Sequence, residues 1–89
     1  MTPEEFREHG HAMIDWIADY VDDAGSRPVF PDIEPGDIRR QLAEHPPGAP
    51  HPFADVFADL ENVIVPGLTQ WQHPDFFAWF PSNITYPSI

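Results

Sequence analysis

Residues 2–23, TPEEFREHGHAMIDWIADYVDD, decide the fold of this chain, because they combine a helix start signal with a long helical pattern. Thr2 is a capping residue, Pro3 suits the first helical position, and Glu5 completes a Thr-x-x-Glu capping box. The apolar residues that follow fall within an arc of roughly 160° on a helix. They are Phe6, Met13, Ile14, Trp16, Ile17, Tyr20 and Val21. The segment is predicted to be an amphipathic helix.

The apolar face of this helix is wider than so short a chain can cover. Eighty-nine residues allow one small domain at most. At this size, folding hides only about 60% of the surface that the unfolded chain exposes. We therefore expect the face to pack partly against a partner.

Two further helices are predicted downstream. Glu34-Pro35-Gly36-Asp37 restarts a short helix, and Pro52 opens a longer one that ends at Pro66-Gly67. The longer helix has an apolar stripe of roughly 120°. Its members are Phe53, Val56, Phe57, Leu60, Val63 and Ile64. Proline-bound connectors at 26–34 and 45–51 separate the helices. The predicted fold class is all-α: three helices joined by proline-rich connectors, followed by an extended aromatic C-terminal arm.

The aromatic arm begins with WQHPDFFAWFPS, residues 71–82, whose aromatic residues show no helical spacing. Aromatic side chains give area and shape for a flat apolar ligand, which a few polar groups then orient. Ser82, Thr85 and Tyr86 offer such groups. The alternative is that these aromatics form a dimer or domain interface and touch no ligand. The two interpretations are compatible.

Composition excludes several classes of partner. The net charge is −11, with four arginines and no lysine, which disfavours binding to nucleic acid or to anionic membranes. The chain has no cysteine, no secretory signal and no apolar run of the roughly 18–20 residues that span a membrane. A soluble, cytoplasmic protein is therefore expected.

No motif of catalysis or metal binding is visible. The histidines lack the spacing of metal ligands and are interpreted as solvated surface groups. They are His9, His11, His45, His51 and His73. No nucleophile-base arrangement and no glycine-rich loop after a strand is present, so the chain itself is predicted to supply no catalytic, cofactor-binding or metal-binding residue.

An ordered set of sequence blocks resembles the amino-terminal domain of the pyridoxal-phosphate-dependent aromatic L-amino acid decarboxylases, the group II decarboxylases. The set covers essentially the whole chain. Its blocks are Glu5-Phe6-Arg7, Ile14-Asp15-Trp16-Ile17-Ala18-Asp19-Tyr20, Arg27-Pro28-Val29-Phe30-Pro31, Glu34-Pro35-Gly36, Ile64-Val65-Pro66-Gly67-Leu68-Thr69-Gln70-Trp71, His73-Pro74, Phe76-Phe77-Ala78-Trp79-Phe80-Pro81 and Tyr86-Pro87-Ser88.

The resemblance implies the N-terminal part of a fold-type I enzyme that decarboxylates an aromatic L-amino acid to the amine. It implies that residues 1–70 form a helical dimerisation domain, which packs on a second copy of the chain. Residues 71–89 then form an aromatic arm that leads into a cofactor domain beyond this segment. The residues expected near the substrate ring are Trp71, Trp79, Phe80, Pro81 and Ser82.

The resemblance leaves the substrate open among DOPA, tyrosine, tryptophan and phenylalanine. Family members often have tyrosine at the position of Trp79, so an indole replaces a phenol here. Pyridoxal phosphate is expected in the full-length enzyme, where a lysine binds it. Because this segment has no lysine, it is predicted to be inactive alone and to bind no cofactor by itself. Two alternatives remain: a stand-alone acidic helical homodimerisation module without catalytic activity, and an aldehyde-forming relative of the decarboxylases.

Overall fold

A computed structural model of the chain describes residues 1–78 and 84–89. Helices are the regular secondary structure of these residues, and no strand occurs among them. The chain divides into two units, Met1–Val29 with Gln70–Ile89, and Phe30–Thr69. The all-α class is confirmed in this coarse form, whereas the proline-rich connectors and the extended aromatic arm stay predictions. No helix in the described ranges is long and apolar enough to cross a membrane.

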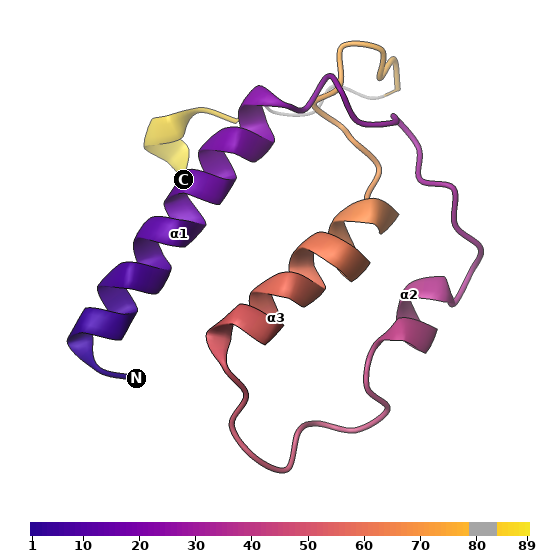
Figure 1. Ribbon diagram of the computed structural model, residues 1–89. Helices are drawn as coiled ribbons and strands as arrows, with labels where there is room; N and C mark the ends of the chain where they lie inside the picture. The colour runs from indigo at the N-terminus through magenta and orange to yellow at the C-terminus, as the bar shows by residue number, and fades with distance from the viewer. Residues whose placement is uncertain (79–83) are drawn as a thin grey trace. The chain divides into compact units, whose positions relative to one another are not determined.

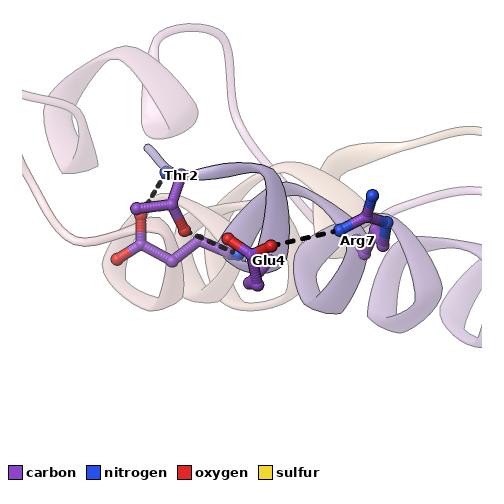
Figure 2. Close-up of polar contacts among 4 residues, drawn as sticks. Thr2, Glu4 and Arg7 are labelled. Carbon is purple, nitrogen blue, oxygen red and sulfur yellow. Dashed lines mark hydrogen bonds and ion pairs between the residues drawn. The ribbon is translucent and has the colours of Figure 1, made fainter.

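The first unit is built on α1, Pro3–Asp22, which begins where the sequence predicts (Figure 1). Thr2 caps the helix: its Oγ1 accepts the Glu5 N–H at 3.2 Å, and the Glu5 carboxylate accepts the Thr2 N–H at 2.6 Å. Figure 2 shows this reciprocal pair of bonds beside the contact from Arg7 to Glu4. The bond from the Thr2 N–H lowers the pKa of Glu5, because it stabilises the charged carboxylate. The capping box is therefore confirmed.

The apolar face of α1 is largely uncovered. No residue of the helix is buried. Phe6 is 68% exposed and Ile14 is 64% exposed, although both are large apolar side chains. Burying such a side chain stabilises a protein by about 1.5–3 kcal/mol. The described residues leave that stabilisation unused, as the width of the apolar arc predicts.

The second unit contains α2, Asp37–Gln41 (Figure 1). Its N-cap is Gly36, whose φ of 93° lies in the left-handed region that favours glycine. The Asp37 carboxylate accepts the Glu34 N–H at 2.7 Å and pairs with Arg40. The bond from the Glu34 N–H, supported by Arg40, lowers the pKa of Asp37.

The longer helix of the second unit changes type along its length. It begins as α3, Phe53–Asp59, continues as a π-helix, η1, Leu60–Ile64, and ends as a 3₁₀ turn, η2, Val65–Gly67. The predicted end of the helix at Pro66-Gly67 is confirmed, but the helix is no longer an α-helix beyond Asp59. The cause is Pro66, which has no N–H and whose ring would collide with the Asn62 carbonyl in an α-helix. The Val65 N–H bonds to the Leu60 carbonyl instead.

A thin apolar centre holds the second unit together. Val65 is 5% exposed, and α2 packs against η1. The rings of Phe53 and Phe57 stack with centroids 5.5 Å apart. Gly67 lies so close to Ile38 that a Cβ atom there would overlap the Ile38 side chain. Glycine at this position permits the close approach of the two segments.

Candidate functional site

The C-terminal end of α1 carries a cluster of stacked side chains. Trp16 and Tyr20, one helical turn apart, stack with ring centroids 5.2 Å apart and an interplanar angle of 18°. The Arg27 guanidinium lies 5.0 Å from the centroid of the Tyr20 ring, within range of a cation–π contact. Arg27 also pairs with Asp23, at 3.6 Å between Nη2 and Oδ2. Two neighbours thus fix the Tyr20 ring, and its hydroxyl is directed to another segment.

The partner of the Tyr20 hydroxyl is Gln70, which lies in the segment that leads to the C-terminus. Gln70 is 5% exposed and is the one buried polar side chain among the described residues. The Tyr20 hydroxyl donates to Gln70 Oε1 at 2.6 Å. The Gln70 backbone N–H donates to the Val29 carbonyl at 2.9 Å. A buried amide is stable only when hydrogen-bonded, so these bonds explain how a glutamine occupies this position. They tie the residue before Trp71 to α1 and to the segment that follows it.

Two successive turns follow Gln70. The Gln70 carbonyl accepts the His73 N–H at 3.0 Å, and the His73 carbonyl accepts the Phe76 N–H at 3.0 Å. The turns bring Trp71 and Phe76 together, with ring centroids 6.4 Å apart and an interplanar angle of 15°. Such stacked pairs contribute about 0.5–1.5 kcal/mol beyond the area that they bury. Residues 70–76 therefore form a short hydrogen-bonded segment, called here the Gln70 turn, that presents a tryptophan.

His73 helps to close the Gln70 turn. Its Nδ1 accepts the Asp75 N–H at 2.9 Å. The His73 side chain is 11% exposed. The prediction of a solvated surface histidine is therefore wrong for His73, because its side chain is largely shielded from solvent.

The structure places one of the five residues predicted near a substrate. Trp71 is 50% exposed and stacks on Phe76, so one part of its ring is packed and another part is open. The other four lie outside the described residues: Trp79, Phe80, Pro81 and Ser82. The predicted substrate wall stays a prediction.

Sequence reasoning missed Tyr20 and Gln70 as a pair. The helical pattern places Tyr20 among the apolar residues of the α1 face, and no local motif indicates that Gln70 is buried. Their separation of 50 residues gives no local signal. The one signal for this pair in the sequence is the tyrosine itself, because a tyrosine on an apolar helix face needs a hydrogen-bond partner for its hydroxyl.

Two apolar depressions flank α1 in the first unit. The larger, about 270 Å³, is lined by α1 and by the 3₁₀ turn η3, Tyr86–Ser88, which lies beside the helix in Figure 1. Its lining residues are Ile14, Ile17, Ala18, Tyr86 and Ile89. The smaller, about 170 Å³, is lined by Tyr20, Val21, Ala24, Gln72 and Ile84. Exposed apolar surfaces of this kind are typical of contacts with another protein segment or with a ligand.

Positive charge is not gathered in one place. Arg7 pairs with Glu4, Arg27 with Asp23, and Arg40 with Asp37. Arg39 donates to the carbonyls of Ala43 and Glu44. Within residues 1–78 and 84–89, no three histidines, aspartates or glutamates are grouped so as to hold a metal ion.

Comparison with known proteins identifies relatives of the whole segment. The family model for the pyridoxal-dependent decarboxylase conserved domain matches residues 35–89. The aromatic-L-amino-acid decarboxylase of Rattus norvegicus is 44% identical over 89 residues, which is 100% of this chain and 18% of that protein.

Solved structures give the same result for the fold. The crystal structure of Oryza sativa TDC with PLP and tryptamine matches 97% of this chain at 35% identity, with a TM-score of 0.88. The crystal structure of Rhodiola rosea 4-hydroxyphenylacetaldehyde synthase matches 97% at 32% identity, with a TM-score of 0.86. The chain spans 18% of each of these structures.

Proposed function

The chain belongs to the pyridoxal-dependent decarboxylase family, and we propose that it forms the N-terminal part of an enzyme converting an aromatic L-amino acid to the amine and carbon dioxide. The observation that carries this proposal is the match along the full segment to the rat aromatic-L-amino-acid decarboxylase. The match to the rice structure, which contains tryptamine, an aromatic amine, adds support from the fold.

The cofactor of this family does not fit the residues of this segment. Covalent attachment of pyridoxal phosphate would need a lysine amine, and residues 1–89 contain no lysine. Binding of a phosphate group needs a cluster of positively charged side chains or N–H donors. Each arginine of this chain instead pairs with a carboxylate or a backbone carbonyl within its own unit. We assign pyridoxal phosphate to residues beyond this segment and derive no step through it. The 89 residues alone are accordingly proposed to be inactive.

The first role that we propose for the segment is to form the contact between two copies of the chain. Ile14 and Tyr86, each 64% exposed, border an apolar depression on the first unit. We assign this surface to the interface with a second copy of the chain, since burying it would recover the stabilisation that the described residues leave unused. Residues 1–70 then act as a helical dimerisation domain and residues 71–89 as an aromatic arm. We also propose a cytoplasmic location, which a chain without cysteine favours.

The second proposed role is part of the substrate wall. An indole that is 50% exposed and stacks on Phe76 suits contact with a flat ring through its exposed part. We therefore assign Trp71 to the wall, together with Trp79, Phe80, Pro81 and Ser82, which lie next along the arm.

An assay of products tests the function. The complete polypeptide that carries these residues is incubated with pyridoxal phosphate and, separately, with tryptophan, tyrosine, DOPA and phenylalanine. Release of the amine from one of them supports the proposal. Release of the aldehyde identifies the alternative chemistry, which the similarity to the Rhodiola synthase favours as a second candidate. Absence of both products with all four amino acids refutes the proposed function.

A separate measurement tests the stand-alone alternative. The intact mass of the natural polypeptide distinguishes a module of 10.1 kDa from a segment of a larger enzyme. A mass near 10.1 kDa favours the acidic homodimerisation module, to which the uncovered face of α1 is equally suited. Amine produced by residues 1–89 alone would refute the proposed inactivity of the segment.

A further inference from the structure

Three hydrogen bonds fix Gln70, the residue that directly precedes Trp71 in the chain. Its Oε1 accepts from Tyr20, its N–H donates to Val29, and its carbonyl accepts from His73. These bonds hold the side chain, the amide before it and the carbonyl after it. The backbone from which the Trp71 side chain projects is therefore constrained on its N-terminal side.

The same turn constrains the indole itself. The bond from the Phe76 N–H to the His73 carbonyl sets the position of Phe76, and Trp71 stacks on the Phe76 ring. The plane of Trp71 thus depends on a chain of contacts that begins at Tyr20 on α1. Tyr20 in turn is fixed by Trp16 and Arg27.

We propose that Gln70, held by the Tyr20 hydroxyl, is a positioning residue that sets the plane of the Trp71 indole and thereby the preference of the enzyme among substrate rings of different size. The inference rests on the proposed function, which assigns Trp71 to the substrate wall. Gln70 does not touch the substrate in this scheme and acts through Trp71.

The burial of Gln70 makes this assignment specific. A glutamine that is 5% exposed has little contact with solvent that could replace a lost partner. Loss of the Tyr20 bond therefore removes one hydrogen bond from a buried amide, which favours a movement of the side chain. Because Gln70 and Trp71 are neighbours in the chain, that movement reaches the indole directly.

The test uses two variants that break the same bond from opposite sides. Gln70→Met keeps an unbranched side chain of similar length but removes the acceptor, and Tyr20→Phe removes the donor. The control is Gln41→Met, the same chemical change at an exposed glutamine in the second unit. The kinetic readout is KM and kcat of the complete polypeptide for tryptophan and for tyrosine.

We expect each variant to change the ratio of the two KM values by about tenfold, with kcat changed much less, because a reshaped apolar wall alters ring binding. The double variant should show no larger change than either single variant, because both substitutions remove one bond. A ratio that stays within twofold of the parent in both single variants overturns the proposal. Effects that multiply in the double variant overturn it as well, since they indicate two independent sites.

A spectroscopic readout separates this inference from the proposed function. The polypeptide is labelled with 5-fluorotryptophan, and the fluorine resonance of Trp71 is assigned from its loss in Trp71→Phe. We expect Gln70→Met to shift or broaden that resonance and Gln41→Met to leave it unchanged. An unchanged Trp71 resonance in Gln70→Met overturns the positioning role even in an active enzyme. A shifted resonance in a protein with no decarboxylase activity keeps the positioning role, while the proposed function and the ring preference both fail.

Discussion

The hydroxyl of Tyr20 is the single atom whose removal is expected to loosen the Gln70 turn most. Tyr20→Phe keeps the ring that stacks on Trp16 and lies beneath the Arg27 guanidinium. It deletes only the donor to Gln70 Oε1, which lies 2.6 Å away. The change therefore measures one hydrogen bond without opening a cavity in the cluster.

The magnitude follows from the burial of the acceptor. A buried polar group that loses a hydrogen-bond partner costs up to about 1–3 kcal/mol. Tyr20 itself is only partly buried, so some water reaches the bond, and the lower part of that range applies. We expect the Gln70 turn to lose about 1–2 kcal/mol, which corresponds to a roughly five- to thirtyfold change in the equilibrium between its open and closed states.

Hydrogen exchange measures this equilibrium directly. The Gln70 N–H is bonded to the Val29 carbonyl, so its exchange reports opening of the turn. Peptides covering Gln70 should exchange faster in Tyr20→Phe by the factor given above. Tyr86→Phe is the matched control, because it deletes the same atom from a tyrosine that is 64% exposed. Equal exchange in Tyr20→Phe and in the parent would show that the bond does not stabilise the turn.

Three further predictions concern the rest of the chain. Gly36→Ala should destabilise the second unit by about 1–2 kcal/mol, because alanine is strained at a φ of 93°, whereas Gly48→Ala should not destabilise it; denaturant midpoints of the two variants check this. The lowered pKa of Glu5 contributes stability that is present above the unfolded-state pKa and is lost as the pH falls through the folded-state pKa. Far-ultraviolet circular dichroism should therefore show α1 weakening below about pH 4 in the parent, and the same loss in Glu5→Gln would contradict this. Ile14→Lys should weaken self-association in sedimentation experiments, whereas Ala12→Lys, on the opposite side of α1, should not; equal dimerisation of both variants would remove Ile14 from the proposed interface.

The start of α1 could be predicted from the sequence because its capping residues are close together in the chain. The Thr2 and Glu5 capping box is contained within four residues, and it forms as predicted. The change of helix type beyond Asp59 was not predicted, because apolar spacing does not distinguish an α-helix from a π-helix over one turn. Pro66 was the local signal for this change, because a proline ring collides with the carbonyl four residues earlier in an α-helix.

The candidate site was less predictable because its contacts are distant in sequence. The aromatic residues of the arm indicated a binding surface, but a list of aromatics does not reveal which ring stacks on which. The pairing of Trp71 with Phe76 depends on the turns after Gln70, and those depend on a bond to Tyr20. The burial of Gln70 and the low exposure of the His73 side chain arise from packing, which residue type does not encode.

The measurement that tests the central claim most directly is the release of labelled carbon dioxide. The complete polypeptide is loaded with pyridoxal phosphate and given tryptophan, tyrosine, DOPA or phenylalanine that carries ¹³C in the carboxyl group, and gas and amine are measured together. The account predicts labelled carbon dioxide and an equal amount of aromatic amine from at least one of these amino acids. No labelled carbon dioxide from any of them would contradict it.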